Sequence, residues 1–143
     1  MPDRVELSVV GHGPYSAALA KILPEACYTG YLEGTDLARA YASSDIFVFP
    51  STTDTFGNVI IEAQAAGLPV IVSDIGGPRE LVTGGVNGLI TKALDVDDFT
   101  NAIRRLAENE ALRKEMGAAA RLSVEDRSWP NAFRKFWAAT EIT

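Results

Sequence analysis

The sequence predicts an α/β domain built on a mostly parallel sheet. Short apolar runs alternate with segments of helical spacing along most of the chain, which is typical of parallel strands joined by right-handed helical crossovers. The strongest run, residues 45–50, is continuously apolar from Ile46 to Phe49, as expected for a parallel strand that is covered on both faces. A length of 143 residues is that of one ordinary domain.

The first part of the chain alternates strands and helices. We expect strands at residues 6–10, 28–31 and 45–50, and helices at residues 17–23 and 35–43. The glycine-rich turn from Gly11 to Pro14 ends the first strand. Thr35 is a favourable residue to cap the second helix.

The second part continues the alternation and then becomes helical. A helix is predicted over residues 58–66, because Gly67 provides a C-terminal stop and Pro69 cannot continue it. Strands follow at residues 70–73 and 88–91. Asp95 then caps a helix, residues 110–122 form another, and Ser128 caps a third. The apolar stripes of the first and third of these helices are Val96, Phe99, Ile103 and Leu106, and Trp129, Phe133, Phe136 and Trp137.

Composition excludes several classes of protein. The chain is 47% apolar and 22% charged, which does not fit a collagen, a disulfide scaffold or a disordered chain. Its 13 basic against 19 acidic residues give a net charge of −6, whereas a protein that tracks nucleic-acid phosphates carries the opposite balance. We find no repeat and no linker-like stretch, so we predict one domain over residues 1–143, with a helical tail at 95–140.

Cysteine usage and hydropathy point to a cytoplasmic protein. The single cysteine, Cys27, forms no internal disulfide, which suits a reducing compartment. No apolar run approaches the ~18 residues that would suggest a membrane span, so we do not expect an integral membrane protein. The sole His and the sole Cys cannot build a zinc site alone, and we predict no metal.

The segment from Phe47 to Ala63 carries the candidate chemistry. It reads as a buried strand, a polar loop with a carboxylate at Asp54, and a helix that begins near Gly57 with Glu62 about one turn inside. Ligands of open parallel sheets bind outside the carboxyl ends of the strands, where this loop lies. The first helical amides, at Gly57, Asn58 and Val59, have no partner within the helix and suit a phosphate.

Each of these residues also has an ordinary structural interpretation. Glu62 has the chemistry to accept two hydrogen bonds from a vicinal diol such as a ribose, or it is an exposed helix glutamate with no ligand. Asp54 is either part of a site or simply a cap, since Asp is favoured before a helix. Spacing alone does not decide between these interpretations.

The same segment resembles the Glu-x7-Glu signature of retaining glycosyltransferases with the GT-B fold, specifically the large group 1 family. Asp54 and Glu62 stand at the two acidic positions of that signature. The other matching residues are Pro50, Ser51, Phe56, Gly57, Ala63, Ala65, Gly67, Pro69 and Val70.

Flanking segments extend the resemblance over nearly the whole chain. They are the turn Gly11-His12-Gly13-Pro14, the short strand Thr29-Gly30-Tyr31, the segment from Ser73 to Glu80, and the turn with Gly85, Asn87 and Gly88. The fold it implies is a Rossmann-like three-layer domain with a mostly parallel sheet, the C-terminal half of a GT-B enzyme.

The resemblance implies a role for each candidate residue. Glu62 would bind the ribose hydroxyls of a nucleoside-diphosphate sugar, and Asp54 would lie near the hydroxyls of the donor sugar; these two are the candidate catalytic residues. Family members need no metal, and the nucleotide sugar is the only small molecule we expect. The residues that would line it are Phe56, Gly57, Asn58 and Val59 through backbone amides, and Leu32 and Glu33 beside the base.

Two departures from the family pattern affect the expected activity. Asp54 replaces the usual glutamate with a shorter side chain, which places sugar preference or rate in question. The family's donor domain begins with a further strand and helix that carry an Arg and a Lys for the diphosphate, and no counterpart is found here. In the family sheet that strand lies between those at 5–10 and 45–49. We therefore expect either that these two strands pair directly or that another chain or segment fills the position.

We therefore expect the donor-binding part of a retaining, hexosyltransferase-type enzyme. The N-terminal acceptor domain, or a partner chain, would complete it, and the isolated chain would be inactive or very weak. Self-association is possible through the aromatic stripe near the C-terminus. The alternative is a non-catalytic module that keeps the fold and its nucleotide affinity and acts by assembly with a partner.

Overall fold

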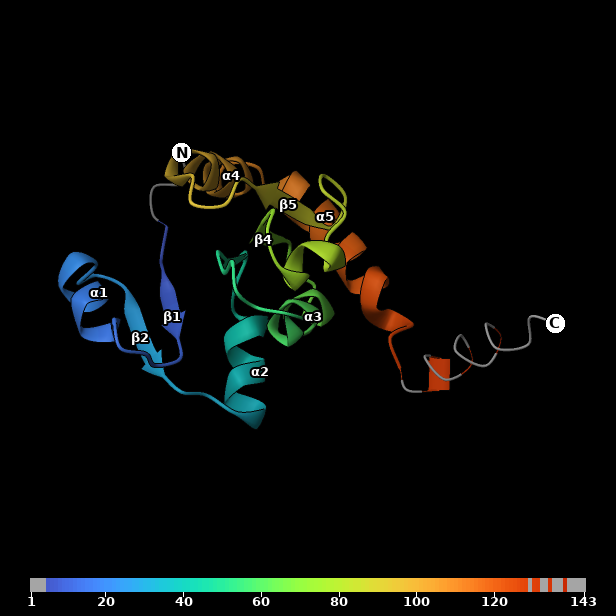
Figure 1. The fold of residues 1–143 in the computed structure, drawn as a ribbon, viewed down its shortest axis with the longest axis horizontal. Coiled ribbons are helices and arrows are strands. Elements are labelled where there is room, and N and C mark those ends of the chain that lie inside the picture. Colours follow the sequence, from blue (N-terminus) through green and yellow to red (C-terminus); the bar gives the residue numbers. More distant parts are fainter. Residues whose placement is uncertain (1–4, 129, 132–133, 135–137, 139–143) are drawn as a thin grey trace. The chain divides into compact units, whose positions relative to one another are not determined.

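The computed structural model describes residues 5–128, 130–131, 134 and 138. It is an α/β structure with parallel strands, as predicted (Figure 1). The chain divides into two compact units, Met1–Ser43 and Ser44–Thr143, each described here by itself. The single domain over residues 1–143 stays a prediction.

The first unit contains two strands and two helices: β1 (Ser8–Val10), α1 (Ser16–Ile22), β2 (Cys27–Gly30) and α2 (Gly34–Ala42). β1 and β2 are parallel, with Ser8 opposite Cys27. None of the described residues 5–43 is buried. Apolar side chains that include Val5, Leu7 and Ile22 line a hollow of about 300 Å³.

The prediction that Thr35 caps the second helix is wrong. α2 begins at Gly34, and Glu33, not Thr35, is the N-cap residue. Glu33 has an extended backbone, and its carbonyl oxygen accepts a hydrogen bond from the Leu37 amide at 3.4 Å. Gly34 follows with φ +53°, a conformation that glycine adopts without steric cost. Thr35 therefore lies inside the first turn.

The second unit is a parallel sheet with helices packed on it. Its strands β3 (Phe47–Phe49), β4 (Val70–Ser73) and β5 (Gly88–Thr91) lie in that order. Phe47 pairs with Val70, and Val70 pairs with Gly88. The connecting and following elements are α3 (Asn58–Ala65), the 3₁₀ helix η1 (Gly77–Leu81), α4 (Val96–Ala107) and α5 (Glu110–Glu125).

The central strand of this sheet is β4, and not the strand with the longest apolar run. All four residues of β4 are buried, whereas those of β3 are only half-buried. β3 pairs with β4 alone and lies at an edge of the three-stranded sheet. The covering of β3 on both faces, expected from its apolar run, is therefore only partial.

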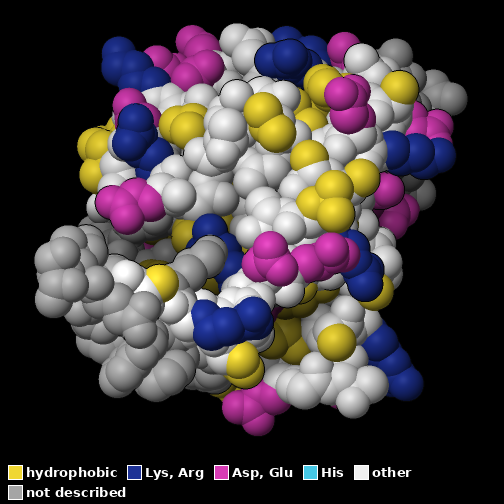
Figure 2. Space-filling model, turned by 90° about the vertical axis from the view of Figure 1, so that its right-hand side faces the viewer, with side chains coloured by type: hydrophobic (Ala, Val, Ile, Leu, Met, Phe, Trp, Pro, Cys, Tyr) yellow, Lys and Arg dark blue, Asp and Glu magenta, His cyan; other side chains and the backbone are white. Residues whose placement is uncertain are grey.

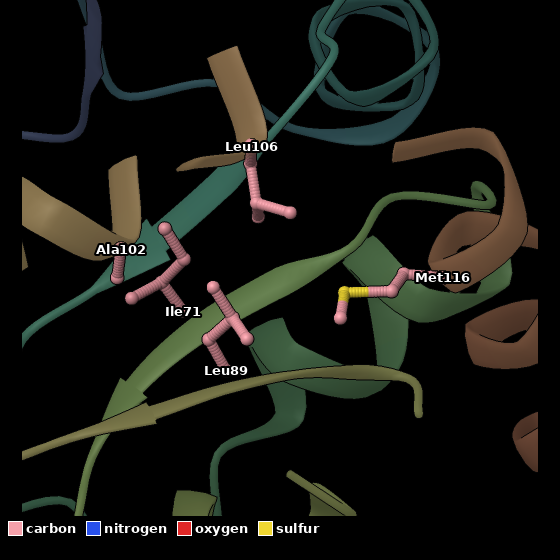
Figure 3. Packing of buried hydrophobic residues seen from close by; sticks show 5 residues of the cluster. All are labelled: Ile71, Leu89, Ala102, Leu106 and Met116. Carbon is pink, nitrogen blue, oxygen red and sulfur yellow. The ribbon is translucent and has the colours of Figure 1, made fainter. Parts of the chain in front are cut away.

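The core joins the sheet to the two long helices. Ile71 of β4 and Leu89 of β5 pack with Ala102 and Leu106 of α4 and with Met116 of α5 (Figure 3). Phe99 and Ile103 pack at the margin of this cluster, as their spacing predicted. Val96, the first residue of the predicted stripe, is instead 76% exposed at the start of α4.

The helix ends follow the predicted chemistry. The Asp95 carboxylate accepts a hydrogen bond from the Asp98 amide at 3.0 Å, and the Ser128 hydroxyl accepts one from the Asn131 amide at 3.3 Å. Asn109 caps α5 by accepting from the Leu112 amide at 2.9 Å. The stripe of Trp129, Phe133, Phe136 and Trp137 lies outside the described residues.

Salt bridges on α5 lie at its surface. The Lys114 ammonium is 2.6 Å from the Glu110 carboxylate, and this hydrogen bond and charge lower the pKa of Glu110. Figure 2 shows basic and acidic side chains interspersed over the visible face. This mixture is typical of solvated helix surfaces.

Helices α3 and α5 meet at a pair of glycines. A Cβ atom on Gly117 of α5 would lie 2.2 Å from the carbonyl oxygen of Gly67, which ends α3 with φ +78°. We predict that Gly117→Ala lowers the free energy of unfolding by about 1–3 kcal/mol through this overlap, although alanine is the better helix former. Chemical denaturation measures the change.

Ala118→Gly, at an exposed position of the same helix, is the matched control for helix propensity and costs at most about 1 kcal/mol. A Gly117→Ala variant that gains as much stability as Ala118→Gly loses would contradict the close packing of the two backbones.

Candidate functional site

Two loops lie at the carboxyl edge of the second unit's sheet. Residues 50–57 follow β3 and lead into α3, and residues 74–76 follow β4 and lead into η1. Because β3 and β4 are parallel neighbours, both loops leave the sheet at the same edge. This is the edge at which open α/β sheets bind ligands.

Asp54 organises the first loop. Its Oδ1 accepts hydrogen bonds from the amides of Phe56 at 3.0 Å and Gly57 at 2.8 Å. Its own amide donates to the Ser51 hydroxyl at 3.2 Å. Two of the four residues expected to line the sugar and diphosphate through their amides, Phe56 and Gly57, thus have those amides paired with a carboxylate in this structure.

Gly57 is buried directly before α3. It has φ +81° and ψ +53°, in the left-handed region that glycine adopts without steric cost. A Cβ atom there would lie 3.0 Å from Pro78 of η1. The missing side chain therefore leaves room for η1.

The second loop packs tightly against the first. The Gly77 amide donates to the Asp54 carbonyl at 3.0 Å, and the buried Ser73 hydroxyl donates to the Ser51 carbonyl at 2.7 Å. A Cβ atom on Gly77 would lie only 2.0 Å from the Thr55 carbonyl oxygen. Ser73 and Gly77 thus connect the two loops. Both belong to the segment from Ser73 to Glu80, whose resemblance to the family gave them no role of their own.

Glu62 lies on the outer face of α3. It is exposed, as is Asn58 one turn earlier, while Ile60, Ala63 and Gln64 of the same helix are buried. Asn58 and Glu62 are four residues apart and therefore share one face. The structure thus places the predicted ribose-binding carboxylate on the solvent side of a helix whose N-terminus adjoins the Asp54 loop.

The buried face of α3 is tied to η1 by a side-chain amide. Gln64 is fully buried, and its Nε2 donates to the Leu81 carbonyl at 2.9 Å. Its Oε1 has no hydrogen-bond partner among the described residues. Sequence pattern alone gave no sign of this polar anchor.

The remaining predicted site residues are Phe56, Leu32 and Glu33. Phe56 is 55% exposed beside the helix start. Leu32 and Glu33 belong to the first unit, where Glu33 precedes α2. Among the described residues, no three His, Cys, Asp or Glu side chains are grouped as a metal would require, and no helix is long and apolar enough to cross a membrane.

The sequence matches a known family over most of its length. Residues 2–109 match the family described as glycosyl transferases group 1. The chain therefore belongs to the group 1 glycosyltransferases.

Curated relatives are similar to most of this chain. The chain is 43% identical over 128 residues to a GDP-mannose-dependent alpha-mannosyltransferase of Corynebacterium glutamicum, a match that covers 87% of this chain and 30% of the relative. It is 45% identical over 129 residues to an enzyme of the same name from Mycolicibacterium smegmatis, with coverages of 90% and 34%. The chain thus spans about a third of the length of these relatives.

Solved structures confirm the fold class, a Rossmann-like domain of GT-B glycosyltransferases. Sucrose-phosphate synthase of Thermosynechococcus elongatus aligns with a TM-score of 0.79 and 26% identity, over 94% of this chain and 39% of that one. Anabaena HepE in complex with UDP-glucose aligns with a TM-score of 0.82 and 23% identity, over 99% and 42%.

The packing between the two loops yields a testable prediction. Gly77→Ala places a methyl group against the Thr55 carbonyl, so the backbone of one loop must move, at a cost of about 1–3 kcal/mol in stability. Thermal unfolding followed by circular dichroism measures the loss.

Gly84→Ala is the matched control, because the nearest atom to its added Cβ is Ile90 Cδ1 at 3.6 Å, an ordinary contact. We expect it to change stability by less than about 0.5 kcal/mol. Equal melting temperatures for the two variants would mean that the loops are not in close contact.

Proposed function

We propose that this chain is the donor-binding part of a retaining glycosyltransferase, which moves a sugar from a nucleoside diphosphate to an acceptor. One observation carries the proposal: an exposed carboxylate, Glu62, lies one turn inside a helix whose N-terminus adjoins a tightly held loop at the carboxyl edge of a parallel sheet. Membership of the family supports it.

The spacing on α3 suits a nucleotide. Asn58 and Glu62 are separated by about 6 Å along the helix axis at 1.5 Å per residue. This separation is comparable with the reach from phosphate to ribose hydroxyls within one nucleotide. The partial positive charge of the helix start favours the diphosphate, and the carboxylate of Glu62 accepts hydrogen bonds from the ribose diol.

Charge development in the reaction fits the same arrangement. As the glycosidic bond to the diphosphate breaks, negative charge grows on the leaving group, and dipoles placed in advance stabilise it. In this proposal Phe56, Gly57, Asn58 and Val59 line the sugar and diphosphate, while the amides of Phe56 and Gly57 stay bonded to Asp54. Asp54 belongs to the sugar end. The position of Leu32 and Glu33 beside the base stays a prediction.

GDP-mannose is the donor to test first. Two relatives that are 43% and 45% identical are GDP-mannose-dependent mannosyltransferases. HepE, by contrast, was solved with UDP-glucose. Comparison of GDP, UDP and ADP sugars therefore assigns the base without presuming it.

The binding test uses Glu62. We predict that Glu62→Ala weakens GDP-mannose binding at least tenfold, about 1.4 kcal/mol, because the ribose hydroxyls lose a charged acceptor. Titration calorimetry on the 143-residue chain measures the affinity, and thermal shift is the second readout, since ligand at 100 times Kd stabilises by about 2.7 kcal/mol.

Glu115→Ala, which removes an exposed carboxylate from α5, is the charge-matched control and should bind like the parent chain. Unchanged affinity in Glu62→Ala would move the site elsewhere. Failure of every nucleoside diphosphate to stabilise the parent chain would overturn the proposal.

In this proposal, transfer of the sugar to an acceptor requires a further domain or chain. The curated relatives are about three times as long, so acceptor groups come from a partner domain or chain. We expect no measurable transfer from the isolated chain and recovery of transfer when a separately produced acceptor domain is added. Binding without any recovered transfer would favour the alternative of a non-catalytic nucleotide-binding module.

A further inference from the structure

We propose that Asp54 is a positioning residue, which acts on the donor by holding the loop before α3 rather than by binding the sugar itself. This inference rests on the proposed function and specifies how its first acidic residue works. It comes from the hydrogen bonds of Asp54, which run back into its own loop and the neighbouring one.

Three groups of Asp54 are engaged at once. The carboxylate accepts from the amides two and three residues ahead, at 3.0 and 2.8 Å. The amide donates to the Ser51 hydroxyl at 3.2 Å, and the carbonyl accepts from the Gly77 amide at 3.0 Å. Asp54 thereby connects the end of β3, the start of α3 and the start of η1.

Of these hydrogen bonds, the two accepted by the carboxylate contribute most to holding the loop. Hydrogen bonds to an ionised acceptor are shorter and stronger than those between neutral groups. Gly57 is buried, and its amide would otherwise lack a partner, which is costly away from water. One oxygen atom of Asp54 therefore holds the backbone at the residue where the loop turns into the helix.

Side-chain length is essential to this geometry. An aspartate closes a tight ring onto the amide two residues ahead, a turn that aspartate and asparagine favour. Glutamate, with one more methylene group, does not close the same ring. If the carboxylate bound the sugar directly, the extra methylene of glutamate would bring it closer to the sugar. If the carboxylate holds this loop, the extra methylene disrupts the hydrogen bonds to the loop amides.

The neighbouring loop leaves little freedom for an alternative arrangement. The carbonyl of Thr55, next to Asp54, lies where a side chain on Gly77 would be, and Gly57 lies against Pro78. If Oδ1 turned outward to a sugar, two backbone amides in this packed region would lose their acceptor. The shape of the donor site is thus fixed before the donor binds.

The test separates loop positioning from sugar contact. It measures the affinity of GDP and of GDP-mannose for Asp54→Ala, Asp54→Glu and Asp54→Asn, and the hydrogen exchange of the Phe56 and Gly57 amides without ligand. We expect Asp54→Ala and Asp54→Glu to weaken GDP and GDP-mannose by the same factor, about tenfold, and to speed exchange of both amides at least tenfold. Asp54→Asn, whose carbonyl still accepts from both amides but carries no charge, should lie between the parent chain and Asp54→Ala in affinity and in amide exchange.

Asp95→Ala is the matched control, because it also removes a carboxylate that accepts from a backbone amide, at the start of α4. It should leave both affinities unchanged even where it lowers stability. The proposal fails if Asp54→Ala weakens GDP-mannose alone, if Asp54→Glu binds GDP-mannose as tightly as the parent, or if amide exchange does not change.

Failure of the proposed function has a different signature. If the parent chain binds no nucleoside diphosphate, the donor assignment is lost, while exchange of the Phe56 and Gly57 amides in the ligand-free chain still decides whether Asp54 holds the loop.

Discussion

The geometry of the candidate site depends on one carboxylate oxygen, Oδ1 of Asp54, which accepts hydrogen bonds from two consecutive backbone amides. Those amides belong to the last residues before α3, so the hydrogen bonds set where the helix begins and which way its first turn faces. A left-handed glycine at the helix start and two further glycines after β4 allow the neighbouring loop to approach the same backbone. The loop conformation thus depends both on the hydrogen bonds of the Asp54 carboxylate and on glycines whose missing side chains allow the two loops to pack closely.

The sheet supplies the rigid base for this arrangement. β4 is buried along its whole length and is paired on both sides, so the loops at the carboxyl ends of β3 and β4 leave a well-packed core. The Ser73 hydroxyl extends that order past the end of the strand by bonding to Ser51 in the other loop. Ligand-binding loops on α/β folds gain their precision from such a scaffold, which agrees with membership of a glycosyltransferase family.

Local chemistry made much of this fold predictable, and long-range packing accounts for the rest. The alternation of apolar runs, the caps at Asp95 and Ser128 and the stop at Gly67 depend on nearby residues, and the structure confirms them. The degree of burial of β3 could not be inferred from its apolar run, because burial depends on which elements pack against the faces and the edge of the strand. The segment from Asp54 to Glu62 was visible as a pattern, but its internal hydrogen bonds and the contact of Gly77 with Thr55 arise only when two distant loops meet.

The buried amide of Gln64 has a mechanical consequence. Because it bonds to the carbonyl at the end of η1, the helix that carries Glu62 and the short helix after β4 are coupled at both ends, through Gln64 on one side and through Gly57 and Pro78 on the other. A ligand that displaced Glu62 would therefore displace α3 and η1 together. Any movement that opens the carboxyl edge of the sheet would then have to involve elements other than α3 and η1.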